Sequence, residues 1–186
     1  MLGSNPTNLT MIHYINQIFD DSQIDYLISL IDQSLDLCVT YNNPAEYHLS
    51  LIGQWYNRTY SVNEKNISWM RFTDVLIPEI SDCINKKVSQ SLDGDFINDL
   101  YFNVAKYEVG SSIGIHNDGV YTDAQEHTLI ILLFDQFTGG DFYINDVMIK
   151  LKKGDAILFN RDCMHQVKEI SDGTRITLVA RMSKRM

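Results

Sequence analysis

The chain has 186 residues, of which 45% are hydrophobic and 21% are charged, and its formal net charge is -9 at pH 7. This length suits one domain with a sizeable core, the apolar content excludes wholesale disorder, and no apolar run is long enough for a membrane helix. The negative charge argues against a nucleic-acid-binding protein, because such binding normally uses a basic face to neutralise phosphates.

The start of the chain and its cysteines predict a cytoplasmic protein. The first six residues lack the basic start and apolar centre of a signal peptide. Cys38, Cys83 and Cys163 are odd in number and have no paired spacing, as expected for reduced thiols. The oligomeric state does not follow from the sequence.

Two amphipathic helices are predicted in the first half of the chain. The first is capped by Asp21 and Ser22. Its apolar residues recur at helical spacing, at Ile24, Leu27, Ile28, Ile31 and Leu35. The second begins near Pro78, which is tolerated in a first turn, and its apolar stripe consists of Ile80, Ile84 and Val88. We expect both helices to pack these stripes on one outer sheet.

Residues 41–70, between the helices, are rich in Asn, Tyr and Trp and show little periodicity. Such a segment suits a lid that covers a substrate. It equally suits a surface excursion packed by its own aromatic side chains.

From residue 101 onward the pattern changes to short strands separated by turns. We expect eight strands, near 101–108, 113–118, 128–134, 141–144, 147–151, 156–160, 164–170 and 175–181. Eight short antiparallel strands suit a double-sheet jelly roll. The predicted fold is therefore mainly β with α, as one domain over residues 1–186. Its helical N-terminal part covers about 1–100 and its barrel about 101–186.

The triplet His116-Asn117-Asp118 is a candidate metal site within this region. In an extended strand the side chains of residues i and i+2 leave the same face, so His116 and Asp118 can converge on one ion. Such a triplet is weak evidence alone, but His165 supplies a second imidazole. Two imidazoles and one carboxylate form the ligand set of a mononuclear non-haem iron(II) site, which leaves one face of the metal open.

The segments 164–170 and 175–181 predict a β-hairpin, because both have strand composition and Ser171-Asp172-Gly173 between them forms a turn. With a three-residue loop, His165, Arg175 and Thr177 share a face. With a two-residue loop, His165 lies on the face opposite Arg175.

Arg175 predicts what binds beside the metal. Iron(II) with two neutral imidazoles and one carboxylate carries a charge of about plus one, and a dicarboxylate such as 2-oxoglutarate reverses its sign. Arg175 restores neutrality, and its planar fork suits a carboxylate. The alternative is that Arg175 pairs with Glu169 across the hairpin.

Residues 101–181 resemble the catalytic barrel of the iron(II)/2-oxoglutarate-dependent dioxygenases, and within them the prolyl 4-hydroxylase-like branch with its PKHD-type hydroxylases. The matching motifs are Tyr107-Glu108-Val109-Gly110, His116-Asn117-Asp118, residues 137–142, residues 153–159, His165 and Gly173-Thr174-Arg175. The N-terminal half resembles the family only in outline.

The resemblance implies that His116, Asp118 and His165 bind iron(II) and that Arg175 anchors 2-oxoglutarate. It also implies that Tyr107 lines the co-substrate pocket, and Thr177 is placed to donate its hydroxyl to the same carboxylate. The chain departs from some relatives at Leu132 or its neighbour, where they have a tyrosine.

The function that this resemblance implies is hydroxylation of a peptidyl side chain, with proline the first candidate, by iron(II), 2-oxoglutarate and O2, with succinate and CO2 as co-products. The expected partner is a peptide or a small molecule, rather than a nucleic acid or a membrane. Two alternatives remain. Arg175 and Arg181 are six apart, as in dioxygenases that demethylate nucleic-acid bases, and a cupin-like barrel could bind metal or ligand without turnover.

Overall fold

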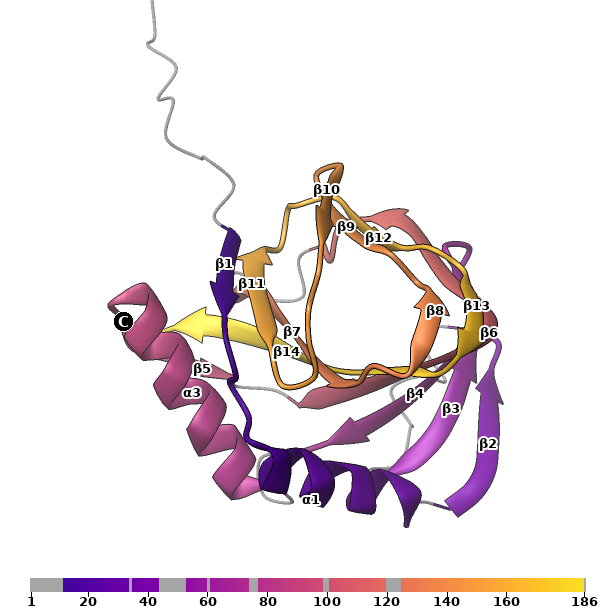
Figure 1. The fold of residues 1–186 in the computed structure, drawn as a ribbon, viewed down its shortest axis with the longest axis horizontal. Coiled ribbons are helices and arrows are strands. Elements are labelled where there is room, and N and C mark those ends of the chain that lie inside the picture. The colour runs from indigo at the N-terminus through magenta and orange to yellow at the C-terminus, as the bar shows by residue number, and fades with distance from the viewer. Residues whose placement is uncertain are drawn as a thin grey trace, which may run out of the picture.

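The computed structural model describes residues 12–33, 35–43, 53–59, 61–73, 77–98, 101–119 and 125–185. Within these ranges the protein is mainly β, with two long helices on one side of a curved sheet (Figure 1). The jelly-roll prediction is confirmed in this respect.

Twelve of the described strands join one sheet. Its main path runs in the order β1-β11-β7-β14-β6-β12-β9-β10. These strands are β1 (Ile12–Ile15), β6 (Phe102–His116), β7 (Gln125–Phe134), β9 (Phe142–Ile144), β10 (Val147–Ile149), β11 (Ala156–Asn160), β12 (His165–Val167) and β14 (Arg175–Lys184). The sheet is extended off this path by β2 (Leu35–Tyr41), β3 (Gln54–Arg58), β4 (Glu64–Phe72) and β5 (Phe96–Asn98). The strands β8 (Phe137–Gly139) and β13 (Ile170–Gly173) form a separate pair.

The two predicted helices are α1 (Asp21–Asp32) and α3 (Pro78–Leu92). The cap of α1 lies one residue earlier than predicted. The side chain of Asp20 accepts from the Gln23 backbone N–H at 2.9 Å, and Gln23 Oε1 accepts from the Asp20 N–H at 3.1 Å. This reciprocal pair satisfies two donors that a helix start leaves free.

The apolar stripes of both helices are buried against the sheet, as predicted, except that Leu35 lies beyond the end of α1 and begins β2. The buried side chains are Ile24, Leu27 and Ile31 from α1 and Ile80, Ile84 and Val88 from α3. They belong to one core cluster with Leu129, Ile131 and Leu158 of β7 and β11. This cluster fills one side of the sheet, and a second cluster that includes Ile130, Phe142 and Phe159 packs on the other side.

The predicted strands 101–108 and 113–118 are one strand, β6. Gly110 in its middle has a φ of 84°, a left-handed conformation that glycine adopts without a steric penalty. A glycine of this kind within a strand is typical of a bulge, which bends the strand while its pairing continues on both sides. The sequence analysis predicted a turn between two strands at this position, where the structure has one continuous strand.

The predicted hairpin between residues 164–170 and 175–181 is wrong. His165 of β12 pairs with His116 of β6, and Arg175 of β14 pairs with Tyr107 of the same strand. Because β4 pairs with the opposite edge of β6 in both regions, β12 and β14 lie one after the other along one edge of β6. The intervening β13 turns away to pair with β8. A long bent strand thus replaces the turn as the element that aligns both segments.

The described part of residues 41–70 consists largely of sheet strands rather than a surface excursion. Its strand β4 pairs with β6 from Glu64 opposite Ile113 to Phe72 opposite Phe102, and β3 pairs with β4. Residues 44–52, where a lid was also considered, lie outside the described ranges.

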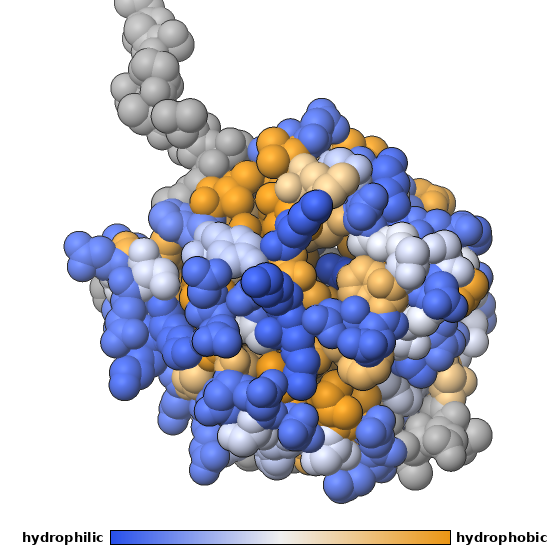
Figure 2. Space-filling model, viewed as in Figure 1, coloured by the Kyte–Doolittle hydropathy of each residue, from blue (hydrophilic) through white to orange (hydrophobic). Residues whose placement is uncertain are grey.

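Hydrophilic residues cover most of the face in Figure 2, notably over α1 and α3, and apolar residues gather in its upper half, near β1 and β10. Two exposed apolar side chains belong to β10, Val147 and Met148. No helix in the described ranges is long and apolar enough to cross a membrane.

A substitution at Gly173 tests the geometry of the turn that leads into β14. A Cβ atom at Gly173, which has a φ of 75°, would lie 2.1 Å from the backbone oxygen of Gln136. Gly110 also has a positive φ but has no atom within 4 Å of such a Cβ. In urea unfolding, Gly110→Ala should cost about 1–2 kcal/mol from the left-handed conformation alone. Gly173→Ala should cost clearly more, and equal losses would contradict the close approach.

Candidate active site

A cavity of about 290 Å3 lies on the side of the sheet away from the helices. Its walls come from the inward faces of β4, β6, β7, β9, β12 and β14 and from residues at the end of β3. All six predicted site residues line it, namely Tyr107, His116, Asp118, His165, Arg175 and Thr177.

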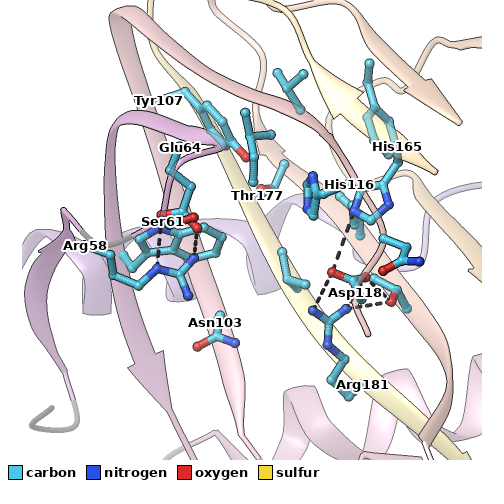
Figure 3. A pocket seen from close by; sticks show the side chains of 18 of the residues that line it. Arg58, Ser61, Glu64, Asn103, Tyr107, His116, Asp118, His165, Thr177 and Arg181 are labelled. Atoms are coloured by element: carbon cyan, nitrogen blue, oxygen red, sulfur yellow. Dashed lines mark hydrogen bonds and ion pairs between the residues drawn. The ribbon is translucent and has the colours of Figure 1, made fainter. Parts of the chain in front are cut away.

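His116, Asp118 and His165 form a compact cluster in this cavity (Figure 3). One potential ligand atom from each residue lies within 4.8 Å of the other two. His116 ends β6, Asp118 follows it by two residues, and His165 begins β12 directly opposite His116. The cluster therefore depends on the register between β6 and β12.

Both imidazoles are oriented by backbone carbonyl groups. Nδ1 of His116 lies 2.7 Å from the oxygen of Gly114, and Nδ1 of His165 lies 3.0 Å from that of Cys163. A carbonyl oxygen only accepts, so each Nδ1 carries the proton and each Nε2 keeps a lone pair for a metal. Burial also lowers the pKa of His165, which favours the neutral ring that a metal requires.

Asp118 is held by two further side chains from the sheet. Arg181 donates from Nη1 to Oδ2 at 2.5 Å and from Nη2 to Oδ1 at 2.7 Å, and Thr128 donates to Oδ2. Burial by itself would raise the pKa of Asp118, but the charge of Arg181, with His165 and the hydrogen bonds, lowers it below its ordinary value. The carboxylate is thus ionised and fixed in orientation before any metal binds.

Arg175 is a buried guanidinium, only 3% exposed. Within the described ranges no carboxylate lies at ion-pair distance from it, and Glu169 pairs with Lys65 at 2.5 Å instead. The alternative pairing of Arg175 with Glu169 is therefore wrong. Burial lowers the pKa of Arg175, because an uncompensated charge is poorly solvated there. The cavity offers this cation to an anionic ligand.

Tyr107 lies opposite Arg175 on the neighbouring strand β6, and Thr177 lies two residues beyond Arg175 on the same strand, β14. The guanidinium carbon lies 5.1 Å from the centre of the Tyr107 ring, and burial raises the pKa of Tyr107 to about 12. The phenol therefore stays protonated and can donate a hydrogen bond. Thr177 is buried two residues beyond Arg175. Leu132, where some relatives have a tyrosine, pairs directly with Thr177 and offers no polar group.

Sequence reasoning missed several polar residues of the cavity. It considered Arg181 only for its distance of six positions from Arg175. The period of two along β14 in fact places residues 175, 177, 179 and 181 on one face, so Arg181 could have been predicted to line the cavity. Thr128 lies directly opposite Arg181 on β7. Arg58, Glu64 and Trp69 come from the irregular segment before residue 70, and no sequence signal predicted them.

Comparison with known proteins confirms the sequence resemblance. Residues 102–181 match the model of the 2OG-Fe(II) oxygenase superfamily. A PKHD-type hydroxylase from Rippkaea orientalis is 23% identical over 180 residues, which are 91% of this chain and 77% of that protein.

Solved structures share the fold. A 2OG-Fe(II) oxygenase from Burkholderia pseudomallei superimposes with a TM-score of 0.68 at 15% identity, covering 94% of this chain and 84% of that one. A prolyl hydroxylase from Trichoplax adhaerens, in complex with a hypoxia inducible factor peptide fragment, gives 0.66 at 17% identity, covering 95% and 84%. At this identity they show the jelly-roll fold alone.

Arg181 provides a test of this geometry. Arg181→Gln leaves Asp118 as a buried carboxylate without its cation, so the metal-free protein should lose about 3–5 kcal/mol in urea unfolding at neutral pH. A divalent ion such as Zn2+ should restore much of this loss by binding the folded state. The control Arg181→Gln/Asp118→Asn should regain stability without added metal. If Arg181→Gln were as stable as the wild type and added Zn2+ did not change its free energy of unfolding, the metal-binding cluster would be contradicted.

Proposed function

We propose that this protein is an iron(II)- and 2-oxoglutarate-dependent dioxygenase that hydroxylates a peptidyl side chain, with proline as the first candidate. One observation carries the proposal: a buried arginine, which has no carboxylate at ion-pair distance among the described residues, shares a cavity with two imidazoles and a carboxylate. The match to the oxygenase superfamily supports it. The free cysteines suit a reducing, cytoplasmic location.

In this proposal His116, Asp118 and His165 hold iron(II), and O2 is the oxidant. The donor set fits, because each Nε2 is available and the carboxylate is ionised. When bound, the metal and 2-oxoglutarate supply oxygen activation for attack on an unreactive C–H bond, with succinate and CO2 as co-products.

The protein's own contribution is orientation, charge balance and exclusion of water. Arg175 binds the distal carboxylate of 2-oxoglutarate, assisted by the hydroxyl groups of Tyr107 and Thr177. The apolar side chains of Ile113, Phe142 and Val167 line the cavity as well and keep water away from the reacting groups.

The metal assignment predicts loss of tight iron(II) binding in His116→Ala, Asp118→Ala and His165→Ala, because each removes one of three ligands. Anaerobic equilibrium dialysis measures the affinity, and far-UV circular dichroism checks the fold. His13→Gln is a control outside the cavity. Wild-type iron affinity in His165→Ala would show that the assignment is wrong.

The anchor assignment predicts that Arg175→Ala weakens 2-oxoglutarate binding and leaves iron affinity nearly unchanged. Removing one partner of a buried charge pair costs about 3–5 kcal/mol, or more than a hundredfold in affinity. Arg175→Lys should fall between, since it keeps the charge and loses the fork. Calorimetry of the Zn2+-loaded variants measures this, with Arg185→Ala as the surface control. Equal losses of metal and 2-oxoglutarate would refute a separate anchor.

Succinate release against a substrate panel tests the reaction itself. We expect stimulation by proline-containing peptides, and weak retention on immobilised single-stranded DNA, because the chain carries a net charge of -9. Stimulation by methylated oligonucleotides alone would identify a base demethylase instead. Bound iron and 2-oxoglutarate without succinate under any condition would favour a binding module.

A further inference from the structure

The peptide group between Cys163 and Met164 lies next to the metal cluster. Its carbonyl oxygen, on Cys163, accepts from Nδ1 of His165 at 3.0 Å. Its N–H, on Met164, donates to Oδ1 of Asn145 at 3.0 Å. One planar peptide group therefore connects the side chain of Asn145 with the imidazole of His165.

Asn145 is held in place by the turn between β9 and β10. Its φ of 47° is a left-handed conformation, which asparagine adopts more readily than most residues. Its backbone N–H donates to the Met164 oxygen at 2.7 Å, and Ile144 before it pairs with His165 of β12. Its side chain also hydrogen-bonds with the Cys163 thiol. These contacts hold the amide oxygen of Asn145 against the Met164 N–H.

Apolar packing does little to set the orientation of the His165 ring. The ring lies against Phe159 and Phe142, whose ring centres are 4.9 and 6.4 Å away. A half-turn of an imidazole about the bond between Cβ and Cγ leaves its shape nearly unchanged but exchanges nitrogen with carbon positions. The hydrogen bond to the Cys163 oxygen therefore decides whether Nε2 or a carbon atom faces the metal position.

Asn145 strengthens this hydrogen bond in two ways. Because a trans peptide group is planar, its N–H and C=O point in opposite directions, and a partner that fixes the N–H also fixes the direction of the oxygen. A hydrogen bond at the N–H also polarises the carbonyl group, which makes its oxygen a better acceptor for Nδ1 of His165. Both effects favour the ring orientation that a metal requires.

The rest of the loop between β11 and β12 is held without the Asn145 side chain. The Arg161 N–H donates to the Glu126 oxygen at 3.0 Å, and the Cys163 N–H donates to the Asn160 oxygen at 3.0 Å. The backbone hydrogen bond of Asn145 also needs no side chain. A variant that lacks this side chain should therefore keep the loop in place and change mainly the peptide group.

We propose that Asn145 is a positioning residue for the metal, which acts through the peptide group of Cys163 and Met164 to hold His165 with Nδ1 protonated and Nε2 facing the metal. This inference rests on the proposed function, because it requires the cluster of His116, Asp118 and His165 to hold iron(II).

The first test compares Asn145→Gly with Asp146→Gly. The two residues are neighbours in the turn, with φ values of 47° and 64°, and glycine suits both conformations. In anaerobic equilibrium dialysis, Asn145→Gly should bind iron(II) about fivefold more weakly than the wild type. This is less than the loss for groups that contact a metal ligand directly, because a peptide group intervenes. Asp146→Gly should bind like the wild type.

Asn145→Asp separates the two contacts of the side chain. It keeps an acceptor for the Met164 N–H but loses the amide N–H2 group, which is the donor available to the Cys163 thiol. We expect it to bind iron(II) at least as tightly as the wild type. Affinity as low as that of Asn145→Gly would assign the effect to the thiol contact and overturn the inference.

NMR of the ring 15N nuclei in the metal-free proteins, at a pH where the imidazoles are neutral, measures the tautomers directly. Asn145→Gly should shift His165 from the Nδ1–H form toward a mixture and leave His116, whose Nδ1 faces the Gly114 oxygen, unchanged. A purely structural role for Asn145 would lower the free energy of unfolding and alter neither ring.

Three results would overturn the inference: an unchanged His165 tautomer in Asn145→Gly, wild-type iron(II) affinity in this variant, or an equal loss of affinity in Asp146→Gly. Failure of the wild type to bind iron(II) would instead refute the proposed function.

Discussion

The pairing of β6 with two later strands along one edge is the constraint on which the site depends. His116 lies opposite His165, and Tyr107 lies opposite Arg175. The ten-position step from His165 to Arg175 therefore runs alongside a nine-position step in β6. Because Gly110 bends β6 within that interval, both ends can face one cavity. A slip of one residue in either pairing would turn the side chains to the other face of the sheet.

The second organising feature is the way in which charges are distributed. Two of the cavity's arginines are each committed to a carboxylate, Arg58 to Glu64 and Arg181 to Asp118. Arg175 is buried, and no carboxylate in the part of the chain that the structure describes pairs with it. The chain has a net charge of -9, so carboxylates are plentiful, yet none of those described pairs with this cation. Arg175 gives the cavity a buried cation with which an anionic ligand can pair.

The sequence predicted the chemistry of the cavity better than its architecture. Ligand-type residues at strand spacing, with an arginine downstream, were sufficient to select His116, Asp118, His165 and Arg175, which all line the cavity. The hairpin was wrong because local turn signals at residues 171–173 outweighed a long-range pairing that no local pattern encodes. The two helices were correct because their stripes recur at helical spacing over several turns. The ends of the first helix differ, since its cap is Asp20 and Leu35 belongs to β2.

The part of the cavity wall that comes from β3 and β4 could not be predicted from the sequence, for a different reason. Arg58, Glu64 and Trp69 lie more than forty positions before His116, in a segment without periodicity. They reach the cavity only because β4 pairs with β6 along most of its length. Residues of this kind become visible once the sheet order is known, and they are where members of one fold can differ in substrate.

The most direct test of the central claim is a crystal structure of the protein with Mn2+ and 2-oxoglutarate, in which manganese replaces iron without turnover. We predict the metal between His116, Asp118 and His165, and the distal carboxylate of 2-oxoglutarate on Arg175. Metal bound elsewhere, or 2-oxoglutarate bound without contact to Arg175, would contradict the account.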